Sequence, residues 1–247
     1  MSDSLFVVTG AASGIGLAMV RRLIRDSTHV LALDINPPPD DCMTSPYARY
    51  ERCDVSLSED WQRIANLLQG WMPPTHVHLN AGIQIAPPNA PLAEYRFAAL
   101  DVERYRRMMG VNVDGVVFGL SHLLPLMPDG GRIVVTSSLA GVTPYGVDPL
   151  YAMSKHAVSG LVRSLADELA ERDIRINAIC PGGIDTGIIP DAQRTDAAVF
   201  MSPEHVAEEV MYLMQVAESG KTWAKVAESK PVFIIRAPGD REGKKRA

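Results

Sequence analysis

Short apolar runs alternate along most of the chain with segments of helical periodicity. The runs Leu5 to Thr9 and Val30 to Asp34 are almost continuously apolar, which is typical of parallel strands covered on both faces. Between them, Leu17, Val20 and Leu23 recur at helical spacing, so a helix is predicted there. The same alternation predicts further strands at 50–54, 76–80, 132–136, 175–180 and 222–226, and helices at 58–68, 112–126, 149–172 and 203–214. Prolines predict loops at 36–45 and 83–90.

This order of elements predicts a single α/β domain over residues 1–247. We expect a doubly wound, Rossmann-type parallel sheet of about seven strands with helices on both faces. A length of 247 residues is sufficient for one domain with a substantial core. We interpret residues 187–201 as a substrate lid and residues 230–247 as a C-terminal extension.

Composition and charge narrow the function classes. Hydrophobic residues make up 47% of the chain, but no apolar run approaches the ~20 residues that cross a bilayer, so we expect no membrane partner. A net charge of -5 offers no broad attraction for nucleic acid. The three cysteines and six histidines show no metal-ligand cluster, so we predict reduced thiols and no metal. The start Met-Ser-Asp-Ser lacks the basic region of a secretory signal, which favours the cytoplasm.

A glycine-rich turn, Thr9-Gly10-Ala-Ala-Ser13-Gly14-Ile15-Gly16, connects the first predicted strand to its helix. Such a turn can present free N–H groups and a positive helix end to a diphosphate. On its own it would also fit an ordinary glycine-rich turn. Asp34 ends the second strand, where a carboxylate can bind ribose hydroxyls and repel a 2′-phosphate, so NAD is favoured over NADP.

A second candidate group lies further along the chain. Tyr151 and Lys155 share one helix face at i, i+4 spacing, and a neighbouring ammonium is expected to lower the pKa of the tyrosine. Ser138 follows a central strand, where doubly wound sheets bind ligands. Each residue also has a simple structural interpretation, as a surface pair or a turn residue, and only their combination indicates catalysis. Asn112 fits either this group or a local backbone hydrogen bond.

Together these motifs make the chain similar to the short-chain dehydrogenase/reductase family. The resemblance rests on the glycine turn, Cys53-Asp54-Val55, Leu79-Asn80-Ala81-Gly82, Asn112-Val113-x-Gly115, Ser137-Ser138-x-Ala140-Gly141, Tyr151-x-x-x-Lys155 and Pro181-Gly182-Gly183-Ile184-Asp185-Thr186, in family order. The residues within these motifs are most similar to those of the 15-hydroxyprostaglandin dehydrogenase-like branch of the family.

The resemblance implies a role for each matching position. Tyr151 would exchange the proton with substrate oxygen, Ser138 would orient that oxygen, Lys155 would bind the nicotinamide ribose, and Asn112 would hold a water. The implied cofactor contacts are Gly10, Ser13, Gly14, Ile15 and Gly16 with the diphosphate, Asp34 with the adenosine ribose, Asp54 and Val55 with adenine, Asn80, Ala81 and Gly82 with the ribose region, and Tyr151, Lys155, Pro181, Gly182, Ile184 and Thr186 around the nicotinamide.

The resemblance therefore implies an NAD-dependent oxidoreductase that interconverts a secondary alcohol and a ketone, acting as a homodimer or homotetramer. The alternative is a non-catalytic dinucleotide-binding redox sensor or scaffold, which would not need the complete catalytic set. A moderately hydrophobic hydroxy compound is expected as substrate, with a hydroxy acid or polyol left open, and it would face residues 187–201, Gln84, Leu139, Thr143, Pro144 and Tyr145.

Overall fold

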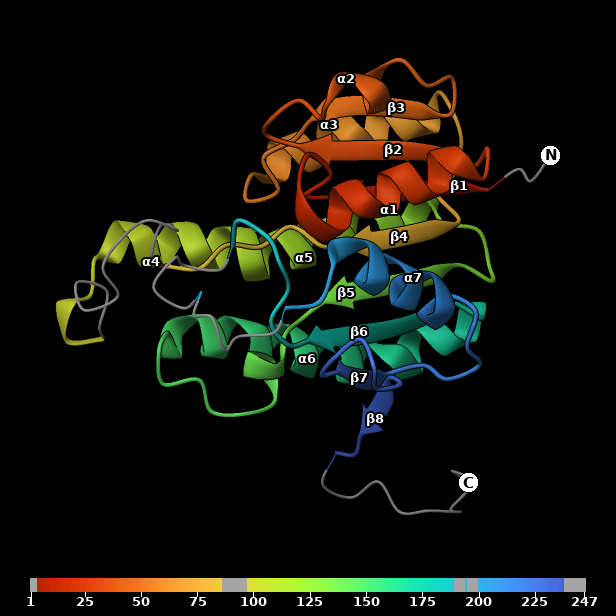
Figure 1. Ribbon diagram of the computed structural model, residues 1–247. Coiled ribbons are helices and arrows are strands. Elements are labelled where there is room, and N and C mark those ends of the chain that lie inside the picture. Colours follow the sequence, from red (N-terminus) through yellow and green to blue (C-terminus); the bar gives the residue numbers. More distant parts are fainter. Residues whose placement is uncertain (1–3, 86–96, 189–193, 195–199, 238–247) are drawn as a thin grey trace.

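One mainly parallel sheet organises the protein (Figure 1). The computed structural model describes residues 4–85, 97–188, 194 and 200–237. The strands are β1 (Leu5–Thr9), β2 (His29–Asp34), β3 (Ala48–Arg52), β4 (His76–Leu79), β5 (Arg132–Thr136), β6 (Arg175–Pro181), β7 (Lys221–Lys225) and β8 (Phe233–Ile235). Their order is β3-β2-β1-β4-β5-β6-β7-β8, and every pair is parallel except β7 with β8. The predicted doubly wound fold is confirmed.

Helices cover both faces of this sheet. They are α1 (Gly14–Arg25), α2 (Asp40–Met43), α3 (Ser58–Gln69), α4 (Val102–Met109), α5 (Gly115–Leu123), α6 (Pro149–Leu169) and α7 (Pro203–Leu213). In Figure 1, α1 and α7 lie in front of the sheet, whereas α3, α5 and α6 lie behind it.

Two apolar cores follow from these layers. Met19 of α1 and Val210 of α7 pack with Val8 and Ile179 on one face. On the other face, Trp61 of α3, Leu120 of α5 and Val162 of α6 pack against alternate residues of the same strands. The strands read as continuous apolar runs because both of their faces are buried.

Three elements differ from the sequence prediction. The helix expected from Asn112 begins earlier, as α4, and continues into α5 through the π-helical turn Gly110–Asp114. The predicted loop 36–45 contains the short helix α2. Part of the C-terminal extension forms β8, which pairs antiparallel with β7 from Thr222 to Ala224. Strand β8 therefore adds an eighth strand to the expected seven.

The helical stretch Val102–Leu126 is long and apolar enough to cross a bilayer when judged by length and composition alone. Its most apolar 18-residue window has a mean hydropathy of 1.3, and 39% of that window is buried inside the protein. Leu120 and Leu123 of this stretch belong to the core behind the sheet.

Candidate active site

The predicted site residues gather where the strand order reverses between β1 and β4, at the carboxyl ends of the central strands. A cavity of about 860 Å³ opens there. Among the predicted residues, it is lined by Gly10, Ser13, Gly14, Ile15, Asn80, Ala81, Gly82, Ser138, Tyr151, Lys155, Pro181, Gly182, Ile184 and Thr186. The described lining does not include Gly16, Asp34, Asp54, Val55 or Asn112.

The glycine turn is built for close backbone approach. Gly10 has φ of 67° and Gly14 has φ of 52°, a region that side chains with a Cβ disfavour. A Cβ on Gly16 would lie 2.0 Å from the carbonyl oxygen of Gly10, so no larger residue fits there. Ser13 precedes the first turn of α1 and its side chain caps no backbone N–H. The helix N-terminus is thereby left open toward the cavity, as a diphosphate requires.

Hydrogen bonds of Thr9 and Asn80 connect the carboxyl ends of β1, β4 and β5 beneath this turn. The Thr9 hydroxyl accepts hydrogen bonds from the backbone N–H of Asn80 at 2.8 Å and of Ala81 at 3.0 Å. The Asn80 amide donates to the Thr9 carbonyl at 3.1 Å and accepts from the Thr136 hydroxyl at 3.1 Å. Thr9 and Thr136 end β1 and β5, and Asn80 directly follows β4, so this network fixes the floor of the cavity.

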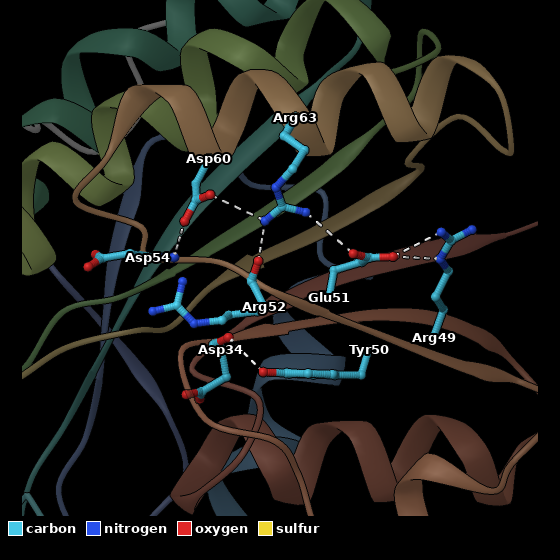
Figure 2. A network of polar contacts seen from close by, with 8 residues as sticks. All are labelled: Asp34, Arg49, Tyr50, Glu51, Arg52, Asp54, Asp60 and Arg63. Atoms are coloured by element: carbon cyan, nitrogen blue, oxygen red, sulfur yellow. Dashed lines mark hydrogen bonds and ion pairs between the residues drawn. The ribbon is translucent and has the colours of Figure 1, made fainter.

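Asp34 stands beside the glycine turn with its carboxylate held in place. One oxygen accepts from the backbone N–H of Ala12 at 2.9 Å, and the other accepts from the N–H of Asn36 at 2.9 Å. Strand register pairs Asp34 with Arg52 on β3. In Figure 2, the Arg52 side chain extends to the same side as the carboxylates of Asp34 and Asp54. The sequence prediction missed this cation, because the pairing of β2 with β3 is not local in sequence.

A polar network holds the end of β3 (Figure 2). Arg63 of α3 donates to the carbonyl oxygen of Arg52 and pairs with Glu51 at 3.3 Å. Asp60 accepts from the backbone N–H of Asp54 at 2.7 Å. Asp54 in turn accepts from the N–H of Ser56 at 3.0 Å. These contacts fix the backbone at the two positions where adenine contact is predicted, Asp54 and Val55.

Tyr151, Lys155 and Ser138 meet at the opposite end of the cavity. Tyr151 and Lys155 lie one turn apart on α6, with the Lys155 nitrogen 5.7 Å from the centre of the Tyr151 ring. The Lys155 ammonium donates to the carbonyl of Thr136 at 2.9 Å. Ser138 lines the cavity with Tyr151, and its side chain acts to lower the pKa of the Tyr151 phenol. The adjacent Ser137 turns inward and bonds to the carbonyl of Lys155 at 3.0 Å, so it anchors the helix instead.

The electrostatics of this group differ from the expectation that lysine lowers the tyrosine pKa. Burial raises the pKa of Tyr151 above its ordinary value, and the hydrogen bond from Ser138 only partly opposes that rise. Burial also lowers the pKa of Lys155 to about 8. Desolvation disfavours both charged forms, and it outweighs the mutual stabilisation of phenolate and ammonium in the free chain.

Asn112 serves the backbone rather than the cavity wall. Its side chain accepts from the N–H of Ile83 at 2.8 Å and donates to the carbonyl of Ile83 at 2.9 Å. It also donates to the Ser154 hydroxyl at 3.0 Å. Asn112 lies in the π-helical turn and is 1% exposed. A Cβ on the neighbouring Gly82 would lie 3.1 Å from the Lys155 nitrogen, so a larger residue there would crowd the lysine. The water-holding role implied for Asn112 stays a prediction.

The structure adds Asp148, which sequence reasoning did not select. Its carboxylate caps α6 by accepting from the backbone N–H of Tyr151 at 2.9 Å, and it also accepts from the N–H of Ile85 at 3.1 Å. The side chain is buried, at 4% exposure. Its sequence signal was an aspartate immediately before Pro149 at a helix start.

Two arginines of α4, Arg104 and Arg107, also line the cavity. They were missed because α4 itself was not predicted. The predicted neighbours Gln84, Leu139, Thr143 and Tyr145 line it too, whereas Pro144 is absent from the described lining. Of the predicted lid, residues 189–193 and 195–199 lie outside the described residues. Residues 238–247 of the C-terminal extension also lie outside them.

The residues fit a nicotinamide dinucleotide on two independent observations. Gly10, Ser13, Gly14 and Ile15 of the glycine turn line the cavity, and the Ser13 side chain caps no backbone N–H of α1. The buried hydroxyl of Thr186 has no hydrogen-bond partner, and the methyl group of that side chain lies close to Gly14 of the turn. An orphaned buried hydroxyl at a cavity wall is a ready partner for a ligand amide. Thr186 is one of the residues predicted to lie around the nicotinamide.

The remaining cysteines and histidines carry no site in the described residues. Cys42, Cys53 and Cys180 are buried and unpaired. His78 is buried in β4 and shares a hydrogen bond with the Thr136 hydroxyl at 2.9 Å. His76 stacks on the ring of Phe6. Among the residues that the structure describes, no three potential ligands gather as a metal site.

Comparison with known proteins gives the family. The sequence matches the family described as short chain dehydrogenase over residues 4–197. It is 31% identical over 246 residues to 2,5-dichloro-2,5-cyclohexadiene-1,4-diol dehydrogenase of Sphingobium indicum, covering 92% of this chain and 96% of that protein. It is 32% identical over 197 residues to short-chain dehydrogenase reductase ATA1 of Arabidopsis thaliana, covering 78% and 70% of the two chains. The protein therefore belongs to the short-chain dehydrogenase family, a family of oxidoreductases.

Solved structures show the same fold. A 4-hydroxyisoleucine dehydrogenase mutant complexed with NADH and succinate superposes with a TM-score of 0.80 at 22% identity, covering 92% of this chain and 98% of that one. A blue fluorescent protein from a metagenomic library in complex with NADPH gives a TM-score of 0.79 at 24% identity, covering 91% and 97%. The assignment to the 15-hydroxyprostaglandin dehydrogenase-like branch stays a prediction.

Proposed function

We propose that the protein is an NAD-dependent oxidoreductase that interconverts a secondary alcohol and a ketone, with Tyr151 as the acid/base. The observation that carries this proposal is the meeting of Tyr151, Ser138 and Lys155 at one end of a cavity whose other end is an open helix N-terminus. A bound nicotinamide ring would accept or supply the hydride. The protein would align the substrate and move the proton.

The proton chemistry follows from the burial of the phenol. Because burial raises the pKa of Tyr151, the free chain holds a protonated phenol that can donate to a ketone oxygen. Alcohol oxidation needs the phenolate, so we expect its rate to rise toward alkaline pH. Ser138 would hydrogen-bond the same substrate oxygen, and the buried Lys155 ammonium would stabilise negative charge on the Tyr151 oxygen.

The preference for NAD is supported by Asp34. Its carboxylate is fixed by two backbone N–H groups beside the turn, where it would repel a 2′-phosphate. Arg52, the register partner of Asp34, opposes this preference with a positive charge. Asp34 is expected to dominate because two backbone hydrogen bonds hold its carboxylate beside the turn. Among the solved structures with this fold, one is complexed with NADH and another with NADPH.

The test follows NADH formation from NAD with a panel of secondary alcohols. Tyr151→Phe is expected to abolish turnover while keeping NAD binding. Tyr145→Phe is the matched control, because Tyr145 lines the same cavity and its ring packs edge-on against the Tyr151 ring, with 6.1 Å between the ring centres. Undiminished turnover in Tyr151→Phe would refute the acid/base role. NAD binding without turnover of any alcohol or ketone would favour the sensor or scaffold.

Cofactor choice has its own variants. Asp34→Ala is expected to improve kcat/KM with NADP relative to NAD, and Arg52→Ala is expected to shift the ratio the opposite way. An unchanged ratio in Asp34→Ala would refute the assignment of Asp34 as the determinant.

Location and assembly complete the proposal. We infer a homo-oligomer formed through α5 and α6, since Val117 and Met153 on these helices are each 42% exposed. Light scattering of the purified protein tests this state. We also keep the cytoplasm as the proposed location, for which three unpaired cysteines in the described chain give support. Fractionation of the source cells tests the location.

A further inference from the structure

The charged side chains that line the cavity all carry positive charge. They are Arg104, Arg107 and Lys155, and the described lining contains no aspartate or glutamate. Lys155 is accounted for, because it is buried and donates to the carbonyl of Thr136 beside the catalytic tyrosine. The two arginines have no role in the chemistry described above.

Arg104 and Arg107 lie one turn apart on α4, so they face the cavity from the same side of that helix. Arg104 lies 3.6 Å from Asp101, with about half of its side chain exposed. The Arg107 side chain makes no hydrogen bond or ion pair with any residue that the structure describes, and it is exposed at the cavity. A guanidinium group stays charged at all physiological pH values, so this part of the wall is permanently cationic.

The position of this charge separates it from the cofactor phosphates. The diphosphate site is the open N-terminus of α1, and a 2′-phosphate would lie beside Asp34. Arg104, in contrast, also lines a small cleft with Asp148, Pro149 and Leu150, at the first turn of α6. That turn carries Tyr151. Figure 1 shows α4 and the start of α6 together on the side toward which the strand arrows point.

Between the arginines and the catalytic group, the wall is partly apolar. Ile83 and Ile85 follow β4, and Ile188 follows β6, and all three line the cavity. A ligand that spans this space would therefore present an apolar body to the isoleucines, its alcohol to Tyr151 and a negative group to α4.

We propose that the substrate is a secondary alcohol with an apolar body and an anionic oxygen group, and that Arg107 binds this group with Arg104 as a second cation. This inference rests on the proposed function, since it assigns the substrate class of the same site. Arginine suits the role because its planar guanidinium can donate two parallel hydrogen bonds to one carboxylate.

Kinetics with matched pairs test the proposal. Hydroxy acids of four to twelve carbons, each with a hydroxyl on a secondary carbon, are compared with their methyl esters. We expect the wild-type protein to favour the acids in kcat/KM, and Arg107→Ala to lose at least tenfold with the acids while staying within twofold on the esters. Arg107→Lys should fall between. Arg106→Ala is the matched control, because Arg106 is an exposed arginine of the same helix outside the described lining.

A binding assay separates this proposal from the proposed function. Octanoate and octanamide are titrated into the protein with saturating NAD, in both the wild type and Arg107→Ala. Octanoate binding that depends on Arg107 would support the anion site even if no alcohol were turned over. Turnover of neutral alcohols without preference for any acid or for octanoate would overturn it and leave the proposed function standing. Weaker NAD binding in Arg107→Ala would also overturn it, because the cation would then serve the cofactor.

Discussion

Replacing Asp148 by alanine is expected to lower the free energy of unfolding by about 2 to 4 kcal/mol. The carboxylate caps the helix that carries the catalytic tyrosine, and it also holds the loop after β4 through the N–H of Ile85. Loss of an N-cap costs about 1 kcal/mol. A buried N–H left without a partner costs about 1 to 3 kcal/mol more, and the N–H of Ile85 would have no acceptor in the variant.

Asp101→Ala provides the matched control for this measurement. Asp101 caps α4 by accepting from the N–H groups of Glu103 at 2.9 Å and Arg104 at 3.1 Å, but its side chain is 48% exposed. Water can replace it there, so we expect a loss of about 1 kcal/mol at most. Urea unfolding at one fixed protein concentration measures both variants. Equal losses in the two, or a loss under about 1 kcal/mol for Asp148→Ala, would refute the reasoning from burial.

A charge effect on the pH profile accompanies the stability effect. Burial is the largest cause of the raised pKa of Tyr151, and the negative charge of Asp148 adds to it. Asp148→Asn removes that charge and keeps one acceptor oxygen, so the pKa of Tyr151 should fall. The alkaline rise of alcohol oxidation should then begin at lower pH. An unmoved profile in an active Asp148→Asn protein would contradict the electrostatic part of the argument.

Three further outcomes follow from the site. Gly16→Ala should lose at least about 2 kcal/mol of stability and its NAD binding, because the added Cβ would overlap the backbone of Gly10. Gly160→Ala has open space around its Cβ and should gain up to about 1 kcal/mol of stability. Urea unfolding and NAD titration compare the two variants. Lys155 has a pKa of about 8 in the folded chain and 10.5 in the unfolded chain, so the unfolded chain binds more protons between these values. The free energy of unfolding should therefore rise with pH in this range, by at most about 3 kcal/mol. Unfolding curves at pH 7.5 and 9.5 measure this rise, and Lys155→Met should abolish it. Thr186→Val should weaken NAD binding about tenfold without loss of melting temperature, because the hydroxyl has no partner in the free chain; unchanged NAD affinity would argue against its contact with the cofactor.

The sheet was predictable because its strands are local apolar runs bounded by turns, and the glycine turn and Tyr151 could be placed from spacing alone. Helix α4 was missed because half of its residues are charged and only Met108 on it is buried, so the sequence shows no apolar stripe there. Its available signal was Asp101 as an N-cap. Strand β8 was missed because three residues form a strand only where β7 offers a free edge.

The parts of the site that could not be predicted depend on contacts between distant segments. Arg52 lies next to Asp34 through strand register, and the second hydrogen bond of Asp148 reaches Ile85, 63 positions away. The pKa of Tyr151 was expected to fall because spacing reveals the neighbouring lysine, whereas it rises because the fold buries both groups. Spacing shows which charges are close, but it does not show how much water the fold removes around them.

The π-helical turn Gly110–Asp114 divides one long helix into two parts, α4 and α5, whose residues can change independently of each other. A wide turn accommodates one extra residue, which rotates the helix after it by about 100° relative to a regular α-helix. The part before the turn can therefore point Arg104 and Arg107 at the cavity while the part after it keeps Leu120 in the core. Substitutions in α4 could thus retune the choice of substrate over generations without disturbing the sheet, whereas deletion of one residue from the turn would alter both at once.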